Sequence, residues 1–300
     1  MKNFELTQSS LKDFIILDRS EWKAKWIDKT RPFEYNTSFI YGSLLDGFLF
    51  EPDKLKDKFA SYRGKCKPSD GLQAIVGLMS KTYDKSKPVK DQLLVAAKTL
   101  KYGGKWKDDT ILSRFDDLDD YIKFCIENKR KTVVLKEFAN MIQGIANYLV
   151  NHYDSDIYKY IVAEPNEDYH NKFQQTIRGT IEGLPCKIIL DILHYDDMNN
   201  IVQDVDFKTT YDVNTFKESI NKYGYDTQLS FYQTILEQNP QAYKNYTLID
   251  PLNIVVGKKD LEIYIHKYSK DELDYSKYGG KAKKGWLEVV GVISAYLKKL

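Results

Sequence analysis

The sequence predicts an α/β fold of the α+β kind, in which a mixed β-sheet is flanked by helices and the N-terminal half is helical. Apolar residues recur at helical spacing through the first half of the 300-residue chain. From about residue 157 the pattern changes to short segments rich in β-branched and aromatic residues, separated by Gly, Pro and Asn. These observations indicate one compact body built on a single sheet.

The N-terminal half is expected to consist of helices. Ser10 and Asp13 form a candidate capping box for a helix over residues 9–27, and an apolar stripe predicts another over 43–60. From about residue 70 to 150 every segment has helical spacing. A block that is helical throughout is therefore predicted there.

The second half is expected to form the sheet. Four segments have the composition of antiparallel strands: IYKYIVAEP, HNKFQQTIRGTIEG, LPCKIILDIL and NNIVQDVDFKTT. The sequence YDDMNN between the last two predicts a hairpin turn. Further strands are expected near residues 245–257 and 261–266, whereas the tail, 285–298, fits either a helix or a strand.

Two short helices are predicted between these groups of strands. Thr215 with Glu218 marks the start of the first, which ends at Gly224. Asp226 is expected to cap the second, which runs to Pro240. The predicted order is then helices, strands, two helices and strands again.

Charge is unevenly distributed along the chain. Lys and Arg number 45 against 43 Asp and Glu, so the net charge of +2 argues against a uniformly basic nucleic-acid binder. Between Lys54 and Lys107, however, 14 basic residues face four acidic ones, and residues 277–300 hold six lysines and one acid. Such segregation suits a surface for polyanions, such as the wall of a DNA channel. The alternative is an ordinary solvated surface, because 39 of the 45 bases are Lys.

Composition also limits the cofactors and the compartment. The three cysteines are too widely spaced for a metal-binding CxxC or a paired disulfide framework, and too few for a four-cysteine iron–sulfur cluster. The Gly-Gly-Lys sequences at 103–105 and 279–281 lack the remaining spacing of a phosphate-binding loop, so no ATP site is expected. The sequence predicts neither a leader nor a membrane span, and the reducing cytoplasm is the expected compartment.

Two acidic residues lie within predicted strands that are otherwise apolar, where a carboxylate is unusual without a specific role. Asp191 ends an apolar run, and Asp206 stands two residues before Lys208. Because strand side chains alternate, Asp206 and Lys208 share one face, while their apolar neighbours point to the core. Two carboxylates on adjacent strands suit Mg²⁺, and a nearby ammonium stabilises charge that develops during phosphodiester hydrolysis. A surface ion pair on an edge strand is the alternative interpretation of these residues.

The order of Asp191, Asp206, Lys208, Gln228 and Tyr232 resembles that of the PD-(D/E)XK nuclease superfamily, specifically its RecB-like and RecE-like exonuclease branch. In that branch the acid-x-Lys strand is followed by a helix that carries a QxxxY motif. Here the spacing of four residues puts Gln228 and Tyr232 on one face of the predicted helix. The resemblance implies a restriction-endonuclease-like core with a central mixed sheet.

A second stretch, Tyr41 to Phe59, is similar to the opening of RecE-like phage and prophage proteins, in which a helix begins Gly-(Ser/Thr)-x-x-His. Gly42, Ser43 and Pro52 match that pattern. The departure is Asp46, which occupies the position of the His. Asp is still a hard oxygen ligand, so metal binding is retained, while metal preference is expected to differ.

The resemblance implies a metal-dependent DNA exonuclease that hydrolyses linear, double-stranded DNA in phage-type recombination or DNA processing. The implied ligands of Mg²⁺ or Mn²⁺ are oxygen donors: Asp46, Asp191, Asp206 and the main-chain carbonyl of Phe207. Asp191, Asp206 and Lys208 are the implied catalytic residues, and Gln228 and Tyr232 are implied to position the DNA. DNA is the implied partner, and relatives that work as rings or with a single-strand annealing protein suggest a homo-oligomer and such a protein as further partners.

On this interpretation the chain is a single nuclease domain over residues 1–300. Its predicted parts follow one another along the chain: N-terminal helices with the Gly-Ser-x-x-Asp helix over 1–69, a helical insertion over 70–155, the catalytic sheet and QxxxY helix over 156–270, and a basic segment over 271–300.

Two other functions fit the same residues. One is a catalytically inactive DNA-binding protein that kept the nuclease fold, which the Asp46 departure would explain. The other is an endonuclease of the same fold.

Nearby polar residues are assigned other roles. Asp204 shares the face of Asp206, so contact with the site is one alternative, but a solvent-facing strand start is the expected position. Asp196 and Asp197 are expected in the hairpin turn. Glu164 and His194 are secondary candidates for the site. An isolated His is more often structural than a ligand, which applies equally to the remaining histidines: His152, His170 and His266.

Overall fold

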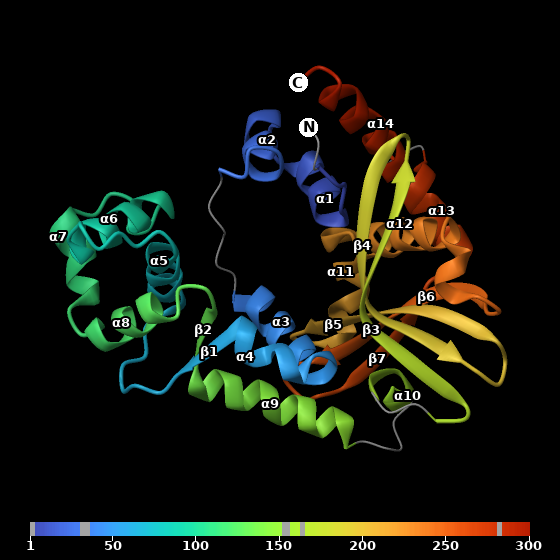
Figure 1. The fold of residues 1–300 in the computed structure, drawn as a ribbon, viewed down its shortest axis with the longest axis horizontal. Helices are drawn as coiled ribbons and strands as arrows, with labels where there is room; N and C mark the ends of the chain where they lie inside the picture. Colours follow the sequence, from blue (N-terminus) through green and yellow to red (C-terminus); the bar gives the residue numbers. More distant parts are fainter. Residues whose placement is uncertain (1–3, 31–36, 152–156, 163–165, 281–283) are drawn as a thin grey trace. The chain divides into compact units, whose positions relative to one another are not determined.

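The computed structural model describes residues 4–30, 37–151, 157–162, 166–280 and 284–300 (Figure 1). The chain forms two compact units. The first joins Met1–Arg31 to Val150–Leu300, and the second is Pro32–Leu149. Within the described residues, no helix has both the length and the apolar character needed to cross a membrane.

The first unit contains the predicted mixed sheet. Its five strands lie in the order of the chain: β3 Tyr169–Ile181, β4 Leu184–Asp196, β5 Ile201–Thr210, β6 Thr247–Gly257 and β7 Ile263–Lys267. The β5–β6 pair is parallel and the other neighbouring pairs are antiparallel. The prediction of a central mixed sheet flanked by helices is confirmed (Figure 1).

Two tight turns fix the register of the first three strands. Glu182 and Gly183 connect β3 to β4 with φ values of 50° and 76°, the left-handed conformation that two-residue hairpins favour. The predicted turn after β4 is also present, and the Asp196 carboxylate accepts a hydrogen bond from the Asn199 backbone amide at 2.9 Å. Local turn chemistry therefore brings β4 and β5 side by side.

The crossover from β5 to the parallel strand β6 contains both predicted helices, α11 Phe216–Tyr223 and α12 Tyr225–Glu237. Gly224 lies between them with φ 71°. It is the C-cap of α11 and the N-cap of α12. The expectation that Asp226 caps the second helix is wrong. Because Gly224 adopts the left-handed conformation, α12 starts at Tyr225, two residues earlier than expected, and takes the buried Asp226 into its first turn.

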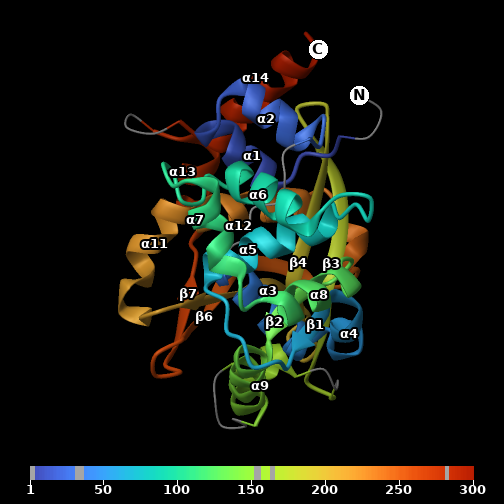
Figure 2. The same ribbon diagram turned by 90° about the vertical axis from the view of Figure 1, so that its left-hand side faces the viewer.

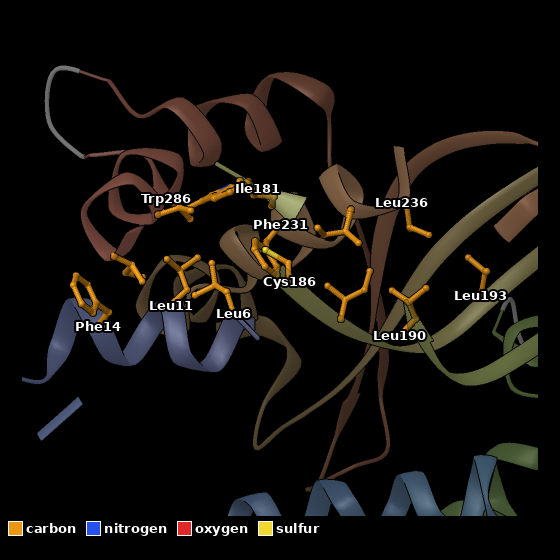
Figure 3. Close-up of a cluster of buried hydrophobic side chains, with 14 of the residues drawn as sticks. Leu6, Leu11, Phe14, Ile181, Cys186, Leu190, Leu193, Phe231, Leu236 and Trp286 are labelled. Carbon is orange, nitrogen blue, oxygen red and sulfur yellow. The ribbon is translucent and has the colours of Figure 1, made fainter. Parts of the chain in front are cut away.

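The core of the first unit lies between the sheet, α12 and the two ends of the chain. Figure 3 shows side chains from the N-terminal segment, β4, α12 and α14 (Trp286–Leu297) meeting in one cluster. Phe231 and Trp286 meet edge to face there, with ring centroids 5.4 Å apart. The Trp286 indole nitrogen also donates to Ser230 Oγ at 3.0 Å, which anchors the C-terminal helix on α12. Helix α13, Lys270–Tyr278, connects β7 to this region.

Several element boundaries differ from the sequence expectations. The helix expected over residues 9–27 is two helices, α1 Gln8–Ile16 and α2 Arg19–Trp26, because Asp18 caps a new helix with its side chain. The capping box of α1 pairs Thr7 with Ser10, not Ser10 with Asp13. The strand expected from residue 157 is wrong, since Tyr158–Ile161 is the short helix α10.

The second unit is mostly helical but contains a small parallel sheet. Its elements are α3 Thr37–Phe50, η1 Pro52–Lys54, α4 Leu55–Lys58, β1 Phe59–Tyr62, α5 Asp70–Lys81, α6 Val89–Thr99, α7 Asp108–Leu112, η2 Ser113–Phe115, α8 Asp119–Glu127, β2 Thr132–Leu135 and α9 Lys136–Val150. Helices α5, α6 and α8 pack around a separate hydrophobic core (Figure 2).

Two expectations for the second unit are wrong. The helix expected over residues 43–60 ends at Phe50, because Pro52 cannot continue it. Residues 70–150 are not helical throughout, because β2 pairs with β1 from Phe59↔Thr132 to Tyr62↔Leu135. A four-residue strand stabilised by a partner some 70 residues away leaves too short a local pattern to be distinguished from a helix.

Candidate functional site

Asp191 and Asp206 lie on neighbouring strands at matching positions. The antiparallel register pairs Ile192 with Val205, which places Asp191 beside Asp206. Asp191 Oδ2 accepts a hydrogen bond from the Phe207 backbone amide at 3.1 Å, and its Oδ1 accepts one from Gln174 Nε2 at 3.3 Å. The sheet therefore brings together the two carboxylates that the sequence singles out.

Lys208 binds Asp206 directly. Lys208 Nζ lies 2.6 Å from Asp206 Oδ2, and the Asp206 side chain is 2% exposed. The side chain of Lys208 keeps 18% exposure, so its ammonium can still be reached from solvent. This is a deeply buried ion pair, and not the exposed edge-strand pair that was the alternative interpretation.

The predicted QxxxY helix delivers Gln228 to the same carboxylate. Gln228 Nε2 donates to Asp206 Oδ1 at 2.5 Å. Tyr232, four residues later on α12, is half-buried and interacts with Gln228. Burial, together with the negative charges of Asp206 and Asp191, raises the pKa of Tyr232, so its hydroxyl keeps its proton. Both residues of the motif thus lie at the carboxylate pair.

Asn253 and Tyr268 complete the support of Asp206, and the sequence interpretation missed both. Asn253 is fully buried on β6 directly opposite Asp206, and its Nδ2 donates to Asp206 Oδ2 at 2.8 Å. The Tyr268 hydroxyl in turn donates to Asn253 Oδ1 at 2.7 Å. An Asn inside the apolar run PLNIVVG was a signal that could have been noticed, because buried amides need specific partners.

Asp204 is also buried, and the expectation that it faces solvent is wrong. Its side chain is completely buried, and neither carboxylate oxygen has a hydrogen-bond partner among the described residues. The register between β5 and β6 shifts between Gln203 and Val205, with the extra residue on β6, so Asp204 keeps the alternation of β5 and shares a face with Asp206. Burial, and then Asp206 and Asp191, raise its pKa well above the usual value.

Acidic side chains outnumber basic ones among the described residues of the site. Burial and the neighbouring Asp206 raise the pKa of Asp191 to about 6. Burial disfavours the Lys208 ammonium, but the carboxylates of Asp206 and Asp191 outweigh it and raise the pKa of Lys208. Three acidic side chains, Asp191, Asp204 and Asp206, thus lie near the one ammonium group of Lys208.

The donor set fits a divalent cation of the Mg²⁺ type. Asp191 and Asp206 supply hard carboxylate oxygens, and Asp204 adds buried oxygens that lack hydrogen bonds. Within the part of the chain that is described, no three His, Cys, Asp or Glu side chains form a ready-made cage for a metal ion. Mg²⁺ does not require one, because it is usually bound through one or two carboxylates, waters and substrate phosphates.

Other predicted or secondary candidates lie elsewhere. Asp46 is on α3 in the second unit, whereas the carboxylate pair belongs to the first, so its part in the metal site remains a prediction. Glu164 and His152 lie outside the described residues. His170 binds Asp197 Oδ2 at 2.8 Å beside the hairpin turn.

His194 is packed as a structural residue. It is 4% exposed, its Nδ1 lies 2.8 Å from Asn171 Oδ1, and the Tyr160 ring meets it edge on. Burial, with Lys159 nearby, lowers the pKa of His194 to about 4. The imidazole is therefore neutral at physiological pH.

The burial of His194 predicts a loss of stability in acid. The unfolded chain protonates this residue near its ordinary pKa of about 6.5, whereas the folded protein resists protonation until about pH 4. The free energy of unfolding should thus fall as the pH drops from about 6.5 to 4, by roughly 3 kcal/mol from this group. Urea denaturation at pH 7 and pH 4.5 should show a smaller fall for His194→Gln than for the wild type. Parallel falls in the two proteins would contradict this prediction.

Comparisons with known proteins place the chain in a family. The sequence matches the family described as "PDDEXK-like domain of unknown function (DUF3799)" over residues 7–273. No curated protein matches the chain. One similar solved structure is a crystal structure from Eubacterium rectale that carries the provisional name of exonuclease, with 15% sequence identity, a TM-score of 0.32 and coverage of 88% of this chain and 84% of that one. Because the family match spans most of the chain, the protein belongs to this PDDEXK-like family of the PD-(D/E)XK nuclease superfamily.

Proposed function

We propose that the protein is a metal-dependent deoxyribonuclease that acts from the ends of linear, double-stranded DNA and releases 5′-phosphate products. The observation that carries the proposal is the contact set around Asp206, which joins Lys208, Gln228 and the neighbouring Asp191 in one buried site. A purely structural ion pair needs neither a second carboxylate nor a QxxxY amide. All of these groups have a use in phosphodiester hydrolysis.

Each side chain has a distinct task in this proposal. Asp191 and Asp206 hold Mg²⁺ or Mn²⁺ together with the Phe207 carbonyl, and the bound ion supplies charge neutralisation and a more acidic water. Lys208 places its ammonium beside the reacting phosphate and stabilises negative charge that grows in the transition state. Gln228 and Asn253 fix the orientation of the Asp206 carboxylate from two sides.

Substrate topology provides the test. Purified protein with Mg²⁺ or Mn²⁺ is incubated with end-labelled linear duplex DNA and with closed circular duplex of the same sequence. Loss of the end label with the circle intact supports exonuclease activity. Cleavage of the circle would instead support an endonuclease of the same fold.

A non-catalytic DNA-binding protein is the second candidate. One feature favours it: residue 46 is Asp, whereas the resemblance to RecE-like proteins implies a His at this position. DNA binding without cleavage, in Mg²⁺, Mn²⁺ and other divalent ions, would support this candidate and would refute the nuclease proposal.

Divalent metal is expected to stabilise the folded protein. Added Mg²⁺ or Mn²⁺ relieves the repulsion among the buried carboxylates, and a ligand at 100 times its dissociation constant stabilises by about 2.7 kcal/mol. The thermal midpoint should then rise by several degrees, at about 2 to 4 °C per kcal/mol for a unit of this size. Differential scanning fluorimetry with added metal or with EDTA measures the shift. Asp206→Asn is the control that should show almost none, and an equal shift in that variant would contradict metal binding at this site.

A further inference from the structure

A cavity of about 390 Å³ lies within the second unit, outside the carboxylate site. The start of α3, the amino ends of β1 and β2 and the end of α5 line it. Its volume falls in the range of roughly 300 to 1,000 Å³ that is usual for ligand pockets. Nothing in the proposed chemistry uses this cavity.

Four basic side chains line the cavity: Lys58, Lys81, Arg130 and Lys131. Among the lining residues that the structure describes, Asp57 is the one acidic residue, and Lys58 is already paired with Glu51. Arg130 and Lys131 form no ion pair with any residue that the structure describes. Counted over its described lining residues, the cavity therefore has an excess of basic over acidic side chains.

The pairing of two parallel strands explains why these cations meet. Lys58 directly precedes β1, and Lys131 directly precedes β2. Phe59 and Thr132 are register partners, so the basic residues before them lie at the same end of the small sheet. The sequence separates these two positions by more than 70 residues, and only the β1–β2 pairing brings them together.

An exposed aromatic ring lies in the same wall. Phe39, on the first turn of α3, is 60% exposed, which is unusual for a large apolar side chain. Ser43, four residues later on the same helix face, adds a hydroxyl to the lining. This combination suits a nucleotide unit. The cations and the hydroxyl would bind its phosphate, and the exposed ring would stack on its flat base.

We propose that this cavity binds a phosphate group of a nucleic-acid strand, with Phe39 packing against the adjoining base. The proposal rests on DNA as the substrate, and it deepens that function by naming one of its contacts. Arg130 supplies a planar fork for two phosphate oxygens, and Lys131 supplies a second charge. All 14 basic residues between Lys54 and Lys107 are exposed in the same unit, which favours a long polyanion over a small one.

Binding experiments in EDTA separate this proposal from catalysis, because cleavage by the proposed nuclease requires metal. A fluorescent single-stranded oligonucleotide is titrated with the full-length protein at several salt concentrations. The test variant is Arg130→Gln with Lys131→Gln. The charge-matched control is Lys123→Gln with Lys136→Gln, two exposed lysines of the same unit that do not line the cavity. Thermal unfolding verifies that both double variants are folded.

The cavity variant should bind the oligonucleotide at least tenfold more weakly than the control variant. The slope of log affinity against log salt concentration should also be smaller in magnitude by about 1.4. Each lost contact between a basic side chain and a phosphate of a single strand reduces that slope by about 0.7, and the variant loses two. Phe39→Ala should weaken binding about five- to 100-fold without changing that slope. Equal losses in the cavity and control variants would overturn the proposal.

Competition distinguishes the two sources of the phosphate. Inorganic phosphate and a nucleoside 5′-monophosphate are added at millimolar concentrations to the bound oligonucleotide. Weak competition by both supports a strand-binding site. Displacement of the oligonucleotide at micromolar monophosphate would overturn the strand proposal in favour of a small phosphorylated ligand. Strand binding without cleavage in metal would refute the nuclease function and leave the cavity assignment intact.

Discussion

Replacing Lys208 with Ala is expected to reduce DNA cleavage by about 10³-fold, the size of effect seen when a preorganised electrostatic group is removed from an active site. The ammonium lies 2.6 Å from Asp206 and is the fixed positive charge that the site offers to a phosphate. Lys208→Ala leaves that position neutral. Initial rates on end-labelled linear duplex with saturating Mn²⁺ measure the loss.

The same substitution also unmasks the repulsion among the acidic side chains. Breaking a buried ion pair by removing one partner costs about 3 to 5 kcal/mol, so the metal-free variant should unfold at a lower temperature. Assays are therefore carried out below that temperature and with metal present. Lys217→Ala is the matched control, because Lys217 is exposed on α11 in the same unit. A folded Lys208→Ala protein with the activity of this control would refute the proposed role.

Replacing Phe231 with Ala is expected to destabilise the protein by about 3 to 5 kcal/mol, the usual cost of removing a large aromatic side chain from a core. Phe231 is fully buried on α12 and packs edge to face on Trp286. The loss should be accompanied by a loss of cleavage, because the same helix carries Gln228 and Tyr232 into the site. Urea denaturation measures the stability change.

Tyr278→Ala provides the comparison for this core substitution. Tyr278 is 63% exposed in the same unit, so its removal should change the free energy of unfolding by less than about 0.5 kcal/mol. If the Phe231 and Tyr278 variants lost equal stability, the core described around α12 and α14 would not be the one that holds the unit together.

Much of the candidate site follows from local geometry. Asp206 and Lys208 are two residues apart on a strand and must share a face, and Gln228 and Tyr232 are four apart on a helix and must do the same. Asp191 ends an apolar run in β4, the strand that precedes the strand of Asp206. The turn between these two strands, YDDMNN, is recognisable from its composition. The structure confirms the proximity of Asp191, Asp206, Lys208 and Gln228.

The supporting residues could not be found in the same way. Asn253 contacts Asp206 across 47 residues, and the crossover through two helices decides which residue of β6 comes opposite. Asp204 obeys the same alternation as Asp206 but was assigned to solvent, because burial of a carboxylate without a partner is rare and costly. Its burial depends on the packing of α12 against β5, which no local pattern shows.

By itself, the sequence determined the mixed sheet, the helical character of the N-terminal half and the order of the catalytic candidates, because strand alternation, helix periodicity and turn residues act over a few positions. Only the tertiary structure decided the pairing of β1 with β2, the cation-lined cavity and the contacts of Asn253 and Asp204. These features depend on contacts between segments that are distant in the sequence. A short window of sequence contains no signal of such contacts. The division of the chain into two units has the same origin, since the first unit is assembled from both ends of the sequence.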